Sequence, residues 1–222
     1  MIHLTKADEP TVLQENAMLW TEVILDKLAS GEEPTAAEKS RYRHPQVKAQ
    51  LIAETGGKCA YCESKLLHVH HGDVEHIYPK SLDPLRTFEW ENLTLACEVC
   101  NQSKSNNDPL LKHIIDPYAV DPEQHLTFLG PLIVSRGTML GNCTREMLKL
   151  TRAGLNEQRQ RQVERLLLIF DRLHDDRLPV PARQAIYADL IATETAPTAQ
   201  YAAMNRAIVR QLSLALPAGL QV

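Results

Sequence analysis

Apolar positions recur at helical spacing in the first part of the chain and again in its last third. Between Leu13 and Leu28 they predict a helix, which the break "SGEEPT" at residues 30–35 should end. A second helical segment, "TAAEKSRYRHPQVKAQLIAETGG", follows and should end at Gly56 and Gly57, because adjacent glycines favour helix termination. Both segments belong to a helical N-terminal region, residues 1–56.

The pattern changes between residues 57 and 112, where no long amphipathic run occurs and short strand-like pieces such as "LTLAC" appear. After an extended pair around "HLTFLGPLIV", three helical segments follow from Cys143 onward. We therefore predict an α+β protein. A small irregular core, residues 57–112, is embedded between the N-terminal helices and a mainly helical C-terminal region, residues 113–222.

The composition is that of an ordinary globular protein, since 222 residues with 44% hydrophobic side chains can bury a core. No apolar run is long enough to cross a membrane, and the start "MIHLTKADEP" lacks the features of a secretory signal, so we expect a cytoplasmic protein. The net charge of −4 is unusual for a nucleic-acid binder, but residues 136–165 hold seven Lys and Arg side chains against three Glu. This segment is either a phosphate-facing patch or the solvated face of a helix.

Four of the five cysteines form two Cys-x-x-Cys pairs, which are Cys59 and Cys62 in "GKCAYCES" and Cys97 and Cys100 in "LACEVCNQ". Two such turns supply the four tetrahedral thiolates that a structural zinc ion accepts. The same ligands suit a rubredoxin-like iron centre, and one pair alone could be a redox dithiol. A closed four-cysteine site staples a small core and leaves no open position, so any catalysis must lie elsewhere.

The residues between the two pairs are the candidates for that chemistry. Glu75 and His76 are adjacent in "GDVEHIYPKS", Asn92 lies in "WENLTLAC", and Asn101 follows the last cysteine. Taken singly, each has a structural interpretation, such as a packed histidine or a turn-forming asparagine. A zinc staple would bring the strand of His76 against "NLTLA" and the helix after Cys97, so that Asn101 would lie near the histidine. Neighbouring residues of a strand point to opposite faces, so Glu75 and His76 need a bulge or a twist to share one site.

The stretches "CAYC", "VEHIYPKS" and "WENLTLACEVCNQSK" together resemble an HNH endonuclease, whose core is a small ββα-metal fold stapled by zinc. The resemblance implies that His76 is the general base and that Asn92 orients its imidazole and braces the loop. It also implies that Asn101 and Glu75 hold a divalent cation, Mg²⁺ or Mn²⁺, although either asparagine could be the ligand. The expected reaction is hydrolysis of DNA to 5′-phosphate ends.

Two positions depart from the family pattern. Asn101 stands where a histidine is common, which favours a hard cation such as Mg²⁺ over zinc at the catalytic site. Glu75 stands where aspartate is common, and its longer side chain changes how a metal would be held.

More narrowly, "EHIYPKS", "IDPYAVDPEQHLTF" and "LKLTRAGLNEQR" resemble the HNH nuclease subunit of the Septu anti-phage defence system. That resemblance implies an ATPase partner of the SMC-like or ABC type, with DNA as the substrate. The competing functions are an inactive, zinc-stabilised module that binds DNA or protein and an electron carrier built on an iron site.

Two further groups of residues lie close to the motif. Lys80 and Lys104 suit contacts with DNA phosphates, or they are ordinary surface lysines. A histidine-rich stretch offers enough ligands for a second metal site, but we interpret it as a polar loop at the mouth of the active site. Its candidate ligands are His68, His70, His71 and Asp73.

Overall fold

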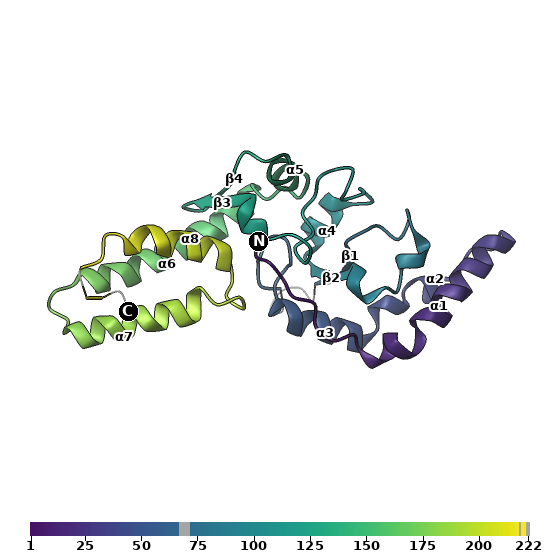
Figure 1. Cartoon of the computed structure of the whole chain (residues 1–222), viewed down its shortest axis with the longest axis horizontal. Coiled ribbons are helices and arrows are strands. Elements are labelled where there is room, and N and C mark those ends of the chain that lie inside the picture. The colour runs from purple at the N-terminus through teal and green to yellow at the C-terminus, as the bar shows by residue number, and fades with distance from the viewer. Residues whose placement is uncertain (67–71, 218, 221–222) are drawn as a thin grey trace.

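The computed structural model describes residues 1–66, 72–217 and 219–220 of an elongated protein (Figure 1). Helices α6, α7 and α8 lie at one end, helix α1 projects at the other, and a small sheet with helix α4 lies between them. The predicted α+β class is therefore confirmed. The division of the chain at residues 56 and 112 stays a prediction.

The helices are α1 (Thr11–Ser30), α2 (Ala36–Lys39), α3 (Pro45–Thr55), α4 (Glu98–Lys104), α5 (Met139–Met147), α6 (Ala153–His174), α7 (Val180–Glu194) and α8 (Ala202–Ser213). Strands β1 (Asp73–His76) and β2 (Leu93–Ala96) form one antiparallel sheet, and β3 (Leu126–Leu129) and β4 (Leu132–Ser135) form the other. Short 3-10 turns are η1 (Arg41–Arg43), η2 (Pro84–Arg86), η3 (Trp90–Asn92) and η4 (Pro122–Gln124).

The central unit consists of the β1–β2 sheet and helix α4. All four residues of β2 are buried, as expected for a strand covered on both faces, and helix α3 lies against it. The chain passes from β2 directly into α4, and Cys97 is the N-cap of this helix. The Cys97 Sγ accepts a hydrogen bond from the backbone N–H of Cys100 at 3.4 Å, as a capping side chain does. The ββα arrangement predicted for the core is thus present.

The second N-terminal segment is not the continuous helix that its pattern predicts. Helix α2 ends at Lys39, and the 3-10 turn η1 follows it. Pro45 disfavours the helical conformation at His44, whose ψ is 140°, so the turn does not continue into α3, which begins anew with Pro45 in its first turn. Between the pieces, the 3-10 turn η1 carries Tyr42 and Arg43. The break therefore presents these two side chains on a tight turn beside the central unit.

The C-terminal helices α6, α7 and α8 contact one another, and β3 contacts α8. Along α6, Leu166 and Phe170 are buried while Leu168 is exposed, so one face of this apolar run packs and the other faces outward. Within the part of the chain that the structure describes, no helix is both long and apolar enough to cross a membrane.

Candidate active site and metal centre

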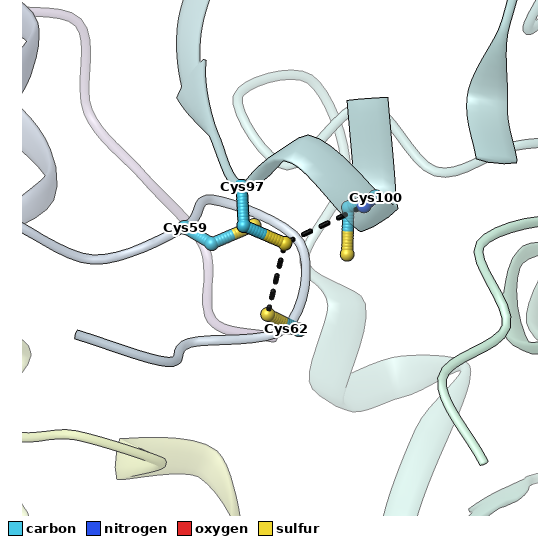
Figure 2. A group of neighbouring side chains, drawn as sticks. All are labelled: Cys59, Cys62, Cys97 and Cys100. Atoms are coloured by element: carbon cyan, nitrogen blue, oxygen red, sulfur yellow. Dashed lines mark hydrogen bonds between the residues drawn. The ribbon is translucent and has the colours of Figure 1, made fainter. Parts of the chain in front are cut away.

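The four paired cysteines converge on one point (Figure 2). All four Sγ atoms lie within 4.8 Å of one another, and those of Cys62 and Cys97 are 3.9 Å apart. A tetrahedral zinc ion with Zn–S bonds of about 2.3 Å holds its sulfur atoms about 3.8 Å apart. The cluster can therefore hold a zinc ion, and among the described residues it is the one group of three or more His, Cys, Asp and Glu side chains close enough together to bind a metal.

Two further contacts tie this cluster to the C-terminal helices. The guanidinium of Arg152 lies 3.7 Å from the Cys100 Sγ and 3.8 Å from the Cys97 Sγ, where a positive charge offsets the charge of the thiolates. On the other side, the Glu63 carboxylate accepts a hydrogen bond from the backbone N–H of Ala203 at the start of α8. The cysteine loop thus anchors α6 and α8 as well as the central sheet.

Helix α4 lies over one face of β1 and meets it in two polar pairs. The Asn101 Nδ2 donates to the Asp73 carboxylate at 3.1 Å, and the Lys104 ammonium pairs with the Glu75 carboxylate at 3.0 Å. Asp73 and Glu75 share this face because alternate strand residues point the same way, and Asn101 and Lys104 share a helix face at a spacing of three. Since its amide nitrogen is used by Asp73, Asn101 is left with its carbonyl oxygen as a possible metal ligand.

Glu75 carries its charge in an unfavourable environment. Its side chain is 9% exposed, and this burial raises the pKa of the carboxyl group, an effect that the Lys104 ammonium opposes. Lys104 itself is 1% exposed and also donates to the backbone carbonyl of His76 at 2.8 Å. The lysine therefore neutralises Glu75 and fixes the backbone of the next residue.

His76 lies at the end of β1, on the opposite face. Its Nε2 is 2.9 Å from the carbonyl oxygen of Thr87, and its ring packs edge-on against Tyr42 with the ring centroids 4.5 Å apart. A carbonyl only accepts hydrogen bonds, so Nε2 must carry the proton and Nδ1 keeps its lone pair. Burial, followed by the charge of Lys80, lowers the pKa of His76 to about 3, so that the imidazole is neutral at physiological pH.

Asn92 is fully buried, and its side chain forms hydrogen bonds with the loop that follows β1. Its Oδ1 accepts from the Tyr78 N–H at 2.7 Å, and its Nδ2 donates to the carbonyls of Tyr78 and Arg86 at 2.9 and 3.0 Å. The loop braced in this way ends at Thr87, whose carbonyl contacts His76. Because its amide groups are occupied and it is 0% exposed, Asn92 is a poorer candidate for a metal ligand than Asn101.

The cysteine pairs and these polar residues fall within one known domain. Residues 59–107 match the family model described as HNH endonuclease. They form an HNH domain. The match includes Glu75, His76, Asn92 and Asn101, and it ends just beyond α4.

Wider similarity extends beyond the HNH domain. Septu protein PtuB from Bacillus thuringiensis is 29% identical over 152 residues, which cover 68% of this chain and 54% of that protein. Septu protein PtuB from Bacillus mycoides (strain KBAB4) is 25% identical over 194 residues, which cover 72% of this chain and 66% of that protein. The chain thus spans about half of one relative and two thirds of the other.

The HNH domain does not contain the bulge that would turn Glu75 and His76 to the same face. Their strand pairs one residue for one with β2, Glu75 opposite Thr94 and His76 opposite Leu93. Glu75 therefore points to α4 and His76 to η1 and the loop before η3. The two side chains are linked through Lys104, which contacts the carboxylate of one and the carbonyl of the other.

The two lysines expected to contact DNA differ in position. Lys80 is half-buried, and its ammonium donates to the Tyr42 hydroxyl at 2.8 Å and lies 4.1 Å from the centroid of that ring. Lys104 is buried and paired with Glu75, so it is not an ordinary surface lysine, and its contact with DNA phosphates stays a prediction. Of the predicted polar loop, Asp73 supports Asn101. His68, His70 and His71 lie outside the described residues.

The segment 136–165 is not a free basic surface. Its six arginines each contact an acceptor within the protein, and the buried Arg159 donates to the Leu150 carbonyl at 2.7 Å. The other contacts are Arg136 with the Glu123 carbonyl, Arg145 with Glu146, Arg152 with the thiolates, Arg161 with Glu157 and Arg165 with Glu194. The charge excess seen in the sequence is therefore used mainly for internal contacts.

Sequence reasoning missed three participants at the HNH site. Tyr42 packs on His76 from a distant turn, Thr87 supplies the carbonyl that fixes its tautomer, and Asp73 orients Asn101. One local signal marks Tyr42, which is the Pro45 that separates its turn from helix α3. Nothing local marks Thr87, since its role lies in its backbone.

Proposed function

We propose that this protein is a metal-dependent DNA endonuclease that acts as the effector of an anti-phage defence system together with an ATPase partner of the SMC-like or ABC type. The proposal rests on the HNH domain and on the similarity to Septu protein PtuB.

The single observation that carries the nuclease proposal is the state of His76. Its Nε2 is held by the Thr87 carbonyl and its ring is held by Tyr42, which fixes the tautomer that keeps the lone pair on Nδ1. A neutral imidazole with a free Nδ1 lone pair can take a proton from an attacking water molecule. His76 is therefore the proposed general base, and Asn92 is the residue that braces the loop behind it.

Glu75 and Asn101 are the proposed ligands of one divalent cation, Mg²⁺ or Mn²⁺, because both offer oxygen donors on the same face of the β1–α4 unit. Such a cation, when bound, stabilises the negative charge that develops on the scissile phosphate and on the leaving oxygen. Asp73 accepts from the Asn101 amide nitrogen, so the carbonyl oxygen is the atom of Asn101 that would bind the cation. The four cysteines are the proposed site of a separate, structural zinc ion.

In the proposed reaction, water adds to the phosphorus atom while His76 takes its proton, and the bond from phosphorus to the 3′ oxygen breaks. The products are a 5′-phosphate and a 3′-hydroxyl. We place the scissile phosphate at the end of β1, next to His76.

The test is conversion of supercoiled plasmid by the purified chain, alone and with the product of the neighbouring gene, in Mg²⁺, in Mn²⁺ or without divalent cation. We expect cation-dependent nicking that is abolished in His76→Ala and retained in the matched control His3→Ala, since His3 is exposed. Nicking that is equal in the His76 variant, or absent under every condition, contradicts the proposal.

A second function has one observation in its favour. The Lys104 ammonium pairs with Glu75 at 3.0 Å and supplies the positive charge that a cation would otherwise bring. That arrangement suits an inactive, zinc-stabilised module that binds DNA or protein. For such a module, His76→Ala preserves the biological phenotype, whereas Cys97→Ser abolishes it through unfolding.

A further inference from the structure

The 3-10 turn η1 brings a basic and aromatic segment to His76 from the N-terminal region. Residues 40–44 read "SRYRH", and the turn is closed by backbone hydrogen bonds from Arg43 to Ser40 and from His44 to Arg41. Pro45 fixes the exit of the turn into α3. The segment is therefore a rigid element, and it is outside the 59–107 match.

Tyr42 is the centre of this element. It is buried, with its ring centroid 4.5 Å from that of His76 and its hydroxyl 2.8 Å from the Lys80 ammonium. The guanidinium carbon of Arg43 lies 5.5 Å from the same ring centroid, and Arg43 is exposed. One aromatic ring thus positions two cations and the candidate base.

None of the ion pairs found in the described part of the chain involves Arg41, Arg43 or Lys80. Most arginines of the segment 136–165 are, by contrast, satisfied internally. In a chain with net charge −4, cations that lie beside the candidate base and form no ion pair among the described residues suit an anionic ligand.

We propose that Arg43 and Lys80, both held beside the ring of Tyr42, form a phosphate-binding subsite that grips the DNA backbone next to the scissile phosphate. This inference rests on the proposed nuclease function. A guanidinium binds phosphate oxygens through two N–H groups, and an ammonium group adds a point charge. Such contacts set the register of the duplex and carry no sequence information.

The test is binding of two short fluorescent duplexes of unrelated sequence to the intact chain, over a series of salt concentrations and without added divalent cation. Arg43→Gln and Lys80→Gln should each weaken binding to both duplexes by the same factor and reduce the slope of log affinity against log salt by about 1. Arg161→Gln is the matched control, because Arg161 is exposed and paired with Glu157 on α6. It should change neither quantity.

Cleavage kinetics separate this subsite from the nuclease proposal. Arg43→Gln should raise KM and leave kcat within about twofold, as expected when only ground-state binding is lost. If the parent chain cleaves DNA and Arg43→Gln has the same affinity, salt slope and KM, the subsite is refuted and the nuclease stands. If the parent binds DNA through Arg43 and never cleaves it, the nuclease fails and the subsite stands. A parent chain with no salt-dependent binding to either duplex overturns the subsite.

Tyr42 offers a test of its positioning role. Tyr42→Phe keeps the ring against His76 and removes the hydroxyl that accepts from Lys80, so DNA affinity should fall while kcat is retained. Tyr42→Leu removes the ring as well and should lower kcat in addition. Equal affinity and kcat in the parent and both variants would refute this role for Tyr42.

Discussion

Replacing Lys104 with methionine removes the charge beside Glu75 and keeps most of the length of the side chain. The two side chains are 1% and 9% exposed and lie 3.0 Å apart, so the variant leaves a buried carboxylate without its partner. Breaking a buried ion pair costs about 3–5 kcal/mol. For a chain of this size each kcal/mol lowers Tm by about 2–4 °C, so we expect a drop of about 6–20 °C. Lys39→Met, at the exposed pair of Lys39 with Glu33, should leave Tm unchanged.

The same variant tests the cation site, because Lys104 competes with a cation for Glu75. Thermal melting with and without Mn²⁺ is the assay. At a concentration of 100 times Kd, Mn²⁺ should restore about 2.7 kcal/mol, or about 5–11 °C, to Lys104→Met, and it should raise the Tm of the parent by less. A Tm of Lys104→Met equal to that of the parent refutes the reasoning about the ion pair. An undiminished Mn²⁺ effect in the double variant Glu75→Gln with Lys104→Met refutes the cation site.

Three further predictions follow from the same contacts. Because the pKa of His76 is lowered to about 3 from 6.5, the folded state binds fewer protons than the unfolded state between these pH values. Between pH 5.5 and 4 the unfolding free energy should therefore fall by about 1.3 kcal/mol per pH unit more in the parent than in His76→Gln. Equal pH dependence of the unfolding free energy in the two proteins, measured by urea denaturation, contradicts this. Asn92→Ala removes three hydrogen bonds to the loop and should lower the unfolding free energy measured by urea denaturation by about 2–4 kcal/mol. A decrease below about 1 kcal/mol would show that other contacts hold Tyr78 in place. Removing a zinc ion from the four cysteines with a chelator should increase amide hydrogen exchange in the loop of Cys59 and Cys62. It should also increase exchange at the start of α8, because the Glu63 carboxylate accepts a hydrogen bond from the Ala203 N–H. An increase confined to the loop contradicts that link.

The sequence predicts the parts of this protein whose signals are local. The two Cys-x-x-Cys pairs, the strand before α4 and the C-terminal helices can be read from spacing and periodicity, because each depends on residues close together in the chain. Because Glu75 and His76 are adjacent, the sequence also predicts that a regular strand points them to opposite faces, and the regular pairing of β1 with β2 agrees with this.

What the sequence does not reveal depends on tertiary packing. Lys104 reads as a surface lysine at a helix end, and only the approach of α4 to β1 makes it the buried partner of Glu75. Tyr42 lies 34 positions before His76 and belongs to a segment whose pattern predicts an unbroken helix. The arginines of 136–165 read as a charged surface, although Arg159 is buried and Arg152 faces the thiolates.

The most direct test of the central claim is the single-turnover rate of DNA cleavage by the parent and by His76→Ala, in Mn²⁺ and at equal zinc content. If His76 is the general base of an HNH nuclease, the variant should be slower by about 10²–10⁴-fold, with DNA affinity retained. Equal rates in the two proteins would contradict the account.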